Sequence, residues 1–279
     1  MSTGPLAIIL AAGKGKRMNS DLPKVVHPVA GEPMVRWVVK AAREAGASPI
    51  VLVVGHGARH VRELFRGERD ITFVTQEPQL GTGHAVDQAR PVFDDLQDSD
   101  VLVLAGDGPL IRAETLRTLV ETHHRTNAAA TIATAVIPDP TGYGRIVRDS
   151  KGRFQAIVEH KDATDAQRAI HEVNPSYYCY RAKPLFERLR LLENNNASGE
   201  YYLTDVLGLM LHSGERVEVV EAVPAEDVLS INDPQQLAEV DAILRKRATP
   251  GLTKEDPDRS GPHSASSPAL SRRHVEVKR

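Results

Sequence analysis

Residues 6–24, LAIILAAGKGKRMNSDLPK, decide the fold class of this chain, because a short apolar run leads directly into a glycine-rich and lysine-rich loop. Residues 6–10 are long enough for a buried parallel strand and too short for a helix of their own. The bare backbone around Gly13 and Gly15 can approach a phosphate closely, and Arg17 and Lys24 add positive charge. We therefore predict a strand followed by a polyphosphate-binding loop. A plain surface loop with scattered lysines is the alternative, and it explains the glycines poorly.

Two familiar phosphate loops do not fit this stretch. The P-loop spacing G-x-x-x-x-G-K-[ST] does not occur in the chain. The dinucleotide fingerprint G-x-G-x-x-G/A could begin at Gly13, but Met18 stands where its last small residue belongs. A nicotinamide-dependent oxidoreductase is therefore disfavoured.

Strands and helices alternate after the loop. Apolar runs predict strands at 49–54, 71–74, 101–104 and 128–136, separated by helices at 33–45, 58–65, 84–89 and 114–124. Such alternation predicts an α/β fold with a Rossmann-like, doubly wound and mainly parallel sheet whose ligands bind at the carboxyl ends of the strands.

The pattern shifts toward strands and turns from residue 142. Strands are predicted at 145–148, 154–158, 172–180 and 217–220, and helices at 183–192, 202–211 and 234–246. We expect one domain over residues 1–247, with a nucleotide half at about 1–140 and a smaller β-rich half at about 141–247 that binds the second substrate. Residues 248–279 are polar and charged, which predicts a disordered tail.

Composition favours a small, charged metabolite as the partner. The chain of 279 residues carries a net charge of −2, which gives no footprint for nucleic acid or a membrane surface. Cys179 is the only cysteine, which excludes an intramolecular disulfide and fits a reducing cytoplasm. No window approaches the roughly 20 apolar residues that a membrane-spanning helix needs. We expect a soluble, cytoplasmic protein.

Two oxygen-bearing side chains are candidate Mg²⁺ ligands. Asp107 follows the strand predicted at 101–104, within LAGDGPL, where a carboxylate would project beyond the sheet edge. Mg²⁺ prefers oxygen ligands and usually takes only one or two from protein. A distant second ligand is offered by Asn232, at the start of the last predicted helix. The alternatives are a turn-forming role for Asp107 and a helix-capping role for Asn232 or Asp233.

Two further groups suit a base and a sugar. Residues 76–85, QEPQLGTGHA, place two amides and a glycine-rich turn before a helix, and such groups can match the edge of a pyrimidine. We assign no catalytic role to His84. In the second half, Glu159, Asn174 and the turn at 142–145 carry groups that bind hydroxyls, and Lys161 is a candidate phosphate ligand, although each signal alone is weak.

Together these motifs resemble the sugar nucleotidyltransferase family and, within it, the uridylyltransferase module of the N-acetylglucosamine-1-phosphate uridyltransferases. The resemblance covers residues 6 to about 246. It rests on ordered strings, namely LAAGKGKRM, SDLPK, QLGTGHA, AGDGPL, TGYGRI, IVEHKDA, NNNASGEYYLTD and the turn at Asn232.

The resemblance implies UTP and a sugar-1-phosphate as substrates, Mg²⁺ as cofactor, and attack of a sugar-phosphate oxygen on the α-phosphorus of UTP with release of pyrophosphate. The alternatives are another sugar or nucleotide, such as glucose-1-phosphate with dTTP, and a non-catalytic regulatory protein that binds nucleotide sugars. The implied site comprises Arg17 and Lys24 as catalytic residues; Leu10, Ala11, Ala12, Gly13, Gln76, Gln79, Gly81 and Thr82 for the nucleotide; Gly144, Glu159, Asn174 and Tyr202 for the sugar phosphate; and Asp107 and Asn232 for the metal.

The chain departs from the family pattern at three places. Ala105 replaces an expected tyrosine and Gly108 a usual valine, which we expect to enlarge or loosen the site. Pro175 and Ser176 follow Asn174 where the family usually has threonine and glycine. These changes border the expected sugar pocket and leave the choice of sugar open. The hexapeptide repeats of bifunctional relatives are not found, so we expect no acetyltransferase chemistry and have no basis for a trimer.

Overall fold

The structure is a computed structural model that describes residues 4–18, 20–96 and 98–248. The tail predicted at 248–279 therefore lies outside the described residues from 249 onward, and Ala248 is the last residue of a helix. Among the described residues, none of the helices combines the length and hydropathy that a bilayer crossing needs.

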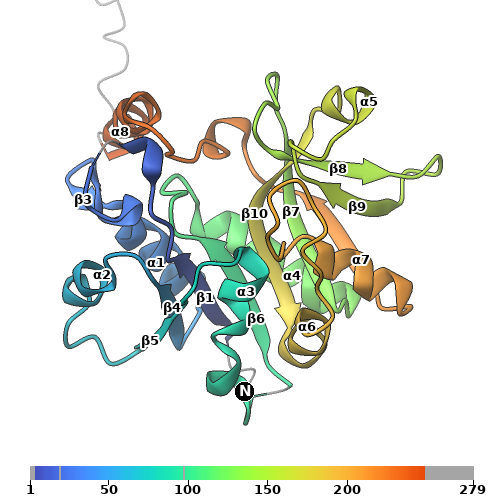
Figure 1. Cartoon of the computed structure of the whole chain (residues 1–279), viewed down its shortest axis with the longest axis horizontal. Helices are drawn as coiled ribbons and strands as arrows, with labels where there is room; N and C mark the ends of the chain where they lie inside the picture. The colour runs from blue at the N-terminus through green and yellow to red at the C-terminus, as the bar shows by residue number, and fades with distance from the viewer. Residues whose placement is uncertain (1–3, 19, 97, 249–279) are drawn as a thin grey trace, which may run out of the picture.

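A nine-stranded mixed sheet forms the centre of the molecule (Figure 1). Its main path follows the order β11-β7-β10-β6-β1-β4-β5, and β8 and β9 branch from β10. The bounds are β1 Leu6–Ala11, β4 Ile50–Val54, β5 Ile71–Thr75, β6 Asp100–Ala105, β7 Ala130–Val136, β8 Gly144–Arg148, β9 Phe154–Val158, β10 Glu172–Arg181 and β11 Val217–Glu221; a separate ribbon pairs β2 Pro28–Val29 with β3 Glu32–Pro33.

The mainly parallel sheet contains one reversed strand on its main path. β1 pairs in parallel with β4 and β6, β4 with β5, and β7 with β11. β10 pairs antiparallel with both β6 and β7. Because β10 belongs to the second half of the chain and lies between two strands of the first, the expected nucleotide and sugar halves share one sheet.

Helices cover both faces of this sheet, as a doubly wound fold requires. Within the described ranges the α-helices are α1 Met34–Glu44, α2 Ala58–Leu64, α3 Thr82–Asp87, α4 Ala113–Thr126, α5 Asp165–Arg168, α6 Ala182–Leu189, α7 Asp205–His212 and α8 Pro234–Ala248. The helix predicted at 202–211 begins at Asp205 instead, which leaves Tyr202 in the preceding turn.

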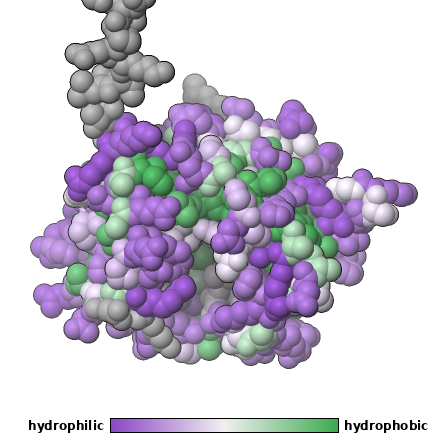
Figure 2. Space-filling model, turned by 90° about the horizontal axis from the view of Figure 1, so that it is seen from above, coloured by the Kyte–Doolittle hydropathy of each residue, from purple (hydrophilic) through white to green (hydrophobic). Residues whose placement is uncertain are grey.

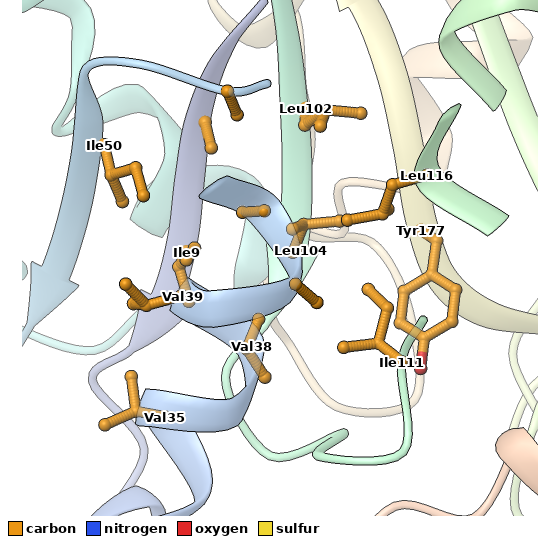
Figure 3. Close-up of a cluster of buried hydrophobic side chains, with 14 of the residues drawn as sticks. Ile9, Val35, Val38, Val39, Ile50, Leu102, Leu104, Ile111, Leu116 and Tyr177 are labelled. Carbon is orange, nitrogen blue, oxygen red and sulfur yellow. The ribbon is translucent and has the colours of Figure 1, made fainter. Parts of the chain in front are cut away.

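Two buried clusters hold the layers together. In the first, Val35, Val38 and Val39 of α1 pack on Ile9 and Ile50 (Figure 3). In the second, α3, α6 and α7 bury apolar side chains on the opposite face. Burial of apolar surface stabilises a fold by about 25 cal/mol per Å², so the sheet is the rigid platform for everything at its edge.

A third cluster fixes α8 beside the phosphate loop. Val240 and Leu244 of α8 are buried with Met18, Val29 and Met34. Met18, the residue that breaks the dinucleotide fingerprint, is therefore a core residue that anchors the loop. Seen from above, hydrophobic residues gather in the middle of the molecular face and the outer rim is polar (Figure 2).

Candidate active site

A cleft of about 310 Å³ lies where β1, β5 and β6 end. Every predicted nucleotide-binding residue except Ala11 lines it; the lining comprises Leu10, Ala12, Gly13, Lys24, Val25, Gln76, Gln79, Gly81, Thr82, Ala85, Ala105, Asp107 and Glu200. Ala11 is 1% exposed and packs in the core on the α1 face, so its side chain does not reach the cleft. A wider hollow of about 750 Å³ shares Gln76, Gln79 and Glu200 with this cleft.

The phosphate loop folds tightly against Lys24. Gly15 has φ +61°, in the left-handed region that favours glycine. A β-carbon at Gly15 would lie 2.6 Å from the β-carbon of Lys24, so only glycine lets the two segments approach this closely. The loop therefore places Lys24, nine residues after Gly15, at the floor of the cleft.

Residues 76–85, which we call the base loop, contain two glutamines that are held by backbone oxygens. The side-chain amide of Gln79 donates to the carbonyl of Ala12, and that of Gln76 donates to the carbonyl of Gly81 at 2.9 Å. His84 Nδ1 lies 3.2 Å from Gln76 Nε2, which places the His84 ring beside this glutamine. The side-chain oxygens of both glutamines have no hydrogen-bond donor among the described residues, and they remain available to a ligand.

Lys24 connects the two candidate metal ligands. Its ammonium group forms an ion pair with the Asp107 carboxylate and donates to Asn232 Oδ1 at 2.9 Å, across 208 positions of sequence. The backbone N–H of Ile231 donates to the Asp107 carbonyl at 3.1 Å, which ties the two ligand segments together. Two oxygens from distant segments thus converge on one cation.

Of the two residues proposed as alternative caps of α8, Asp233 forms the cap and Asn232 does not. Asp233 Oδ1 accepts the backbone N–H of Gln236 at 2.9 Å and so caps the first turn of α8. The Asn232 side chain is left free to face Lys24. The carboxylate of Asp107 and the amide oxygen of Asn232 are oxygen donors of the kind that a divalent metal such as Mg²⁺ binds, and Mg²⁺ takes few protein ligands beside water and phosphates.

Arg17 is not brought into the cleft. It lies in the 3-10 helix Lys16–Met18, is exposed, and makes no hydrogen bond or ion pair with the rest of the described chain. Of the two predicted catalytic residues, only Lys24 therefore lines the cleft in this structure.

Three of the four predicted sugar residues, Gly144, Glu159 and Asn174, form a second polar cluster, the proposed sugar pocket. Asn174 of β10 lies opposite Gly144 of β8 in the antiparallel register. A β-carbon at Gly144 would lie 3.4 Å from Glu159 Oε1, so the glycine leaves room beside this carboxylate. Burial raises the pKa of Glu159, opposed by a hydrogen bond from Thr204, whose hydroxyl donates to Oε1 at 3.4 Å.

Tyr178 and Thr204 join this cluster without having been assigned from the sequence, and the fourth predicted residue, Tyr202, lies beside it. Tyr178 is buried, and its hydroxyl accepts from Asn174 Nδ2 at 2.6 Å. Tyr202, half-buried before α7, hydrogen-bonds the Ser198 side chain and lies near enough to Glu159 to feel its charge. Thr204 and Glu200 belong to the string NNNASGEYYLTD, which is the sequence feature that could have identified them as site residues. The sequence did not indicate that Glu200 lines the nucleotide cleft.

The departures from the family pattern have local consequences. The expected loosening at Gly108 is wrong, because the Tyr177 hydroxyl lies 3.1 Å from where a β-carbon at this glycine would be. Burial raises the pKa of Tyr177 far above its ordinary value, so it stays protonated. Ser176 has φ +68° at a bulge of β10, in the region where the family's glycine would be relaxed.

Known proteins match this chain along most of its described length. The curated relatives include the bifunctional protein GlmU of Brevibacillus brevis, 49% identical over 245 residues, and that of Geobacter metallireducens, 48% identical over 256 residues. These alignments cover 88% and 90% of this chain, but 52% and 54% of the relatives, so the chain spans about half the length of the curated relatives it matches.

Solved structures share the fold at low sequence identity. A UDP-glucose pyrophosphorylase complexed with UDP-glucose aligns with TM-score 0.70 and 16% identity, over 88% of this chain and 99% of its own. A putative glucose-1-phosphate thymidylyltransferase from Bacillus anthracis aligns with TM-score 0.72 and 19% identity, over 86% of this chain and 95% of its own. Both confirm the nucleotidyltransferase type of α/β fold predicted from the sequence.

A family model described as the MobA-like NTP transferase domain matches residues 7–200, which include the phosphate loop, the base loop, Asp107 and the three clustered sugar residues. That range is more than half of the chain. The chain belongs to the MobA-like NTP transferase domain family.

Proposed function

We propose that this chain transfers a uridylyl group from UTP to N-acetylglucosamine-1-phosphate, giving UDP-N-acetylglucosamine and pyrophosphate in a Mg²⁺-dependent reaction. The observation that carries the proposal is the convergence of Asp107 and Asn232 on the Lys24 ammonium at the floor of a cleft whose other wall holds Gln76 and Gln79. The identity of nearly one half with GlmU proteins supports the choice of substrates.

The nucleotide side of the proposed mechanism uses backbone and amide groups. The loop at Ala12 and Gly13 would face the phosphates, because no β-carbon obstructs Gly13 and nothing lies within 4 Å of where one would be. A free side-chain oxygen of Gln76 or Gln79 would accept from N3–H, the one N–H donor of the uracil ring. These contacts orient the α-phosphorus toward the second pocket.

The sugar-phosphate side uses buried side chains. Glu159 and Asn174 would bind sugar hydroxyls, with Gly144 leaving space between them. A phosphate monoester with a second pKa of about 6 is largely a dianion at neutral pH, so attack needs no general base. The new bond forms between a sugar-phosphate oxygen and the α-phosphorus of UTP, and the bond from that phosphorus to the bridging oxygen breaks as pyrophosphate leaves.

Cations would supply most of the rate enhancement. Phosphoryl transfer depends mainly on alignment of the reactants and on neutralising the charge on the phosphates. Lys24 is the side-chain cation placed at the cleft floor, and Arg17 would have to move from its exposed position to contribute. When bound by Asp107 and Asn232, Mg²⁺ would neutralise charge on the nucleotide phosphates. The buried Cys179 fits a reducing compartment, and we expect the reaction in the cytoplasm.

A substrate panel tests the proposal. Four nucleoside triphosphates are combined with N-acetylglucosamine-1-phosphate, glucose-1-phosphate and glucosamine-1-phosphate, and pyrophosphate release is measured with Mg²⁺ and after chelation. We expect the highest kcat/KM with UTP and N-acetylglucosamine-1-phosphate, and no turnover without divalent metal. Turnover only with dTTP and glucose-1-phosphate would overturn the substrate choice, and tight UTP binding without any pyrophosphate release would indicate a regulatory binding protein.

A further inference from the structure

Residues 196–204, which we call the strap, join α6 to α7 and lie against the base loop near α3 (Figure 1). Tyr201 exchanges two backbone hydrogen bonds with that loop: its N–H donates to the Leu80 carbonyl, and its carbonyl accepts from the Gly83 N–H, each at 2.8 Å. The Leu203 N–H donates to Thr82 Oγ1 at 3.0 Å. Tyr201 and Leu203 of the strap are therefore bonded to residues 80–83 of the base loop.

The contact between strap and base loop is close enough to require glycine. A β-carbon at Gly81 would lie 2.6 Å from the Tyr201 carbonyl oxygen, and one at Gly83 would lie 3.0 Å from the same oxygen. Gly81 also has φ +113°. The glycines of the base loop therefore allow the strap to pack against it, in addition to leaving the loop backbone exposed to a ligand. A shift of Tyr201 would move the loop as well.

The other side of the strap is bonded to the proposed sugar pocket. Asp162 Oδ1 accepts the Ala197 N–H at 2.8 Å, and Lys161 Nζ lies 3.3 Å from Ser198 Oγ. At the end of the strap, Thr204 donates to Glu159. The strap is therefore attached to the 159–162 turn at both of its ends.

Asn196 makes the strap a single braced unit. Its Oδ1 accepts the N–H groups of Ser198 and Glu200, each at 3.2 Å, and its Nδ2 donates to the Glu200 carbonyl at 2.6 Å. A side chain that bonds its own following turn restricts the backbone locally. Displacement at Ala197 is thus transmitted to Tyr201 through a braced turn.

We propose that the strap couples the sugar-phosphate pocket to the nucleotide loop, and that Asp162 is the positioning residue that holds the strap in place. Asp162 does not line the nucleotide cleft, and its carboxylate reaches the strap through the Ala197 N–H by a charge-assisted hydrogen bond. This inference rests on the proposed function only for the identity of the two ligands.

Amide hydrogen exchange of the unliganded protein tests the coupling without activity. In Asp162→Ala we expect the Gly83 and Tyr201 amides to exchange roughly 5- to 10-fold faster, as expected for the loss of one bracing hydrogen bond. Asp165→Ala removes the same charge three residues away, from a carboxylate that is 99% exposed and paired with Arg168 on α5, and should leave both amides unchanged. Faster exchange confined to residues 196–198 would overturn the proposal.

Steady-state kinetics give the second arm. Asp162→Ala should raise KM for UTP as well as KM for the sugar phosphate by roughly 3- to 10-fold, with kcat within about 2-fold of wild type. Asp162→Asn keeps an acceptor oxygen and should restore both KM values. A rise in the sugar-phosphate KM alone would show a local role and contradict coupling. If neither substrate supports turnover, the proposed function fails, and the exchange arm still decides whether the strap is coupled.

Discussion

The nucleotide cleft and the sugar pocket are built in different ways on one sheet. The cleft lies at the ends of parallel strands and uses glycine backbone, two amides and the Lys24 ammonium. The pocket lies on antiparallel β8, β9 and β10 and uses side chains that are themselves buried, with Asn174 only 5% exposed. Backbone cradles tolerate loss of a side chain without unfolding, whereas buried polar groups cost free energy when their partners are removed. We therefore expect cleft mutations to change turnover and pocket mutations to change stability as well.

Lys24→Ala should show the largest separation between activity and stability. Loss of the cation at the cleft floor should lower kcat roughly 100- to 1,000-fold, as expected for removal of one electrostatic group that stabilises the transition state. Only an ion pair and one hydrogen bond are lost from the fold, so the melting temperature should fall by no more than about 4 °C. Pyrophosphate release and thermal unfolding are the two measurements.

Lys40→Ala on α1 is the matched control, because its side chain is 65% exposed and its contacts are local: Glu44 lies one turn away at 3.9 Å, and the Trp37 ring centroid lies 5.7 Å from Nζ. This variant should leave kcat and melting temperature unchanged. Wild-type turnover in Lys24→Ala would remove Lys24 from the mechanism and, with it, the distinction between cleft and pocket.

Glu159→Gln tests the sugar pocket, where a mutation should change both activity and stability. Loss of a charged acceptor for a sugar hydroxyl should lower kcat/KM for the sugar phosphate roughly 10- to 100-fold. Burial holds the pKa of Glu159 above its ordinary value of 4.5, and the nearby Asp162 and Asp205 raise it further. The folded state therefore binds this proton more tightly than the unfolded state, and the stability of the wild type falls as pH rises from about 4.5 through the folded pKa.

The variant lacks this titration, so the wild type should lose stability relative to the variant across the same pH range. At pH 7 the variant should be the more stable protein. Thermal unfolding from pH 4 to pH 8 measures the difference. Glu63→Gln, on an α2 side chain that is 58% exposed, is the control and should follow the wild-type profile. A Glu159→Gln protein that is less stable than wild type at every pH would show that hydrogen bonding to the carboxylate outweighs its burial.

The fold was predictable from local pattern except for the position of β10. The residues of β1 and β6 form apolar runs bounded by turns, and both strands appear within a residue or two of their predicted bounds. Residues 172–180 were also predicted as a strand, but the pattern of a single strand carries no information on its neighbours or its direction. The insertion of β10 between β6 and β7, which joins the two halves, follows from tertiary packing.

The same limit applies to the site. Gly13, Gln79 and Asp107 were found because glycine, amide and carboxylate groups next to strand ends are unusual in themselves. The contact of Lys24 with Asn232 and the strap contact of Tyr201 with Gly83 join segments that are distant in sequence. Arg17 shows the reverse case, since its residue type and spacing suit the cleft but its backbone places it outside.

Ser176 offers the smallest and most local test of the comparison. Its φ of +68° costs a residue with a β-carbon about 1–2 kcal/mol, and its side chain hydrogen-bonds Tyr178 in compensation. Both Ser176→Ala and Ser176→Gly lose that bond, but only the glycine relieves the backbone. We expect Ser176→Gly to be more stable than Ser176→Ala by about 1 kcal/mol, measured by denaturant unfolding.

Ser213 provides the control for this pair, because its φ is −86° and its hydroxyl also donates a hydrogen bond, to the Leu209 carbonyl. There alanine should be the more stable replacement, since glycine loses more backbone entropy on folding. If the same replacement, alanine or glycine, is the more stable one at both positions, the bulge of β10 relaxes when the hydrogen bond to Tyr178 is lost. In that case the sugar pocket would be more adaptable than the burial of Asn174 and Tyr178 indicates.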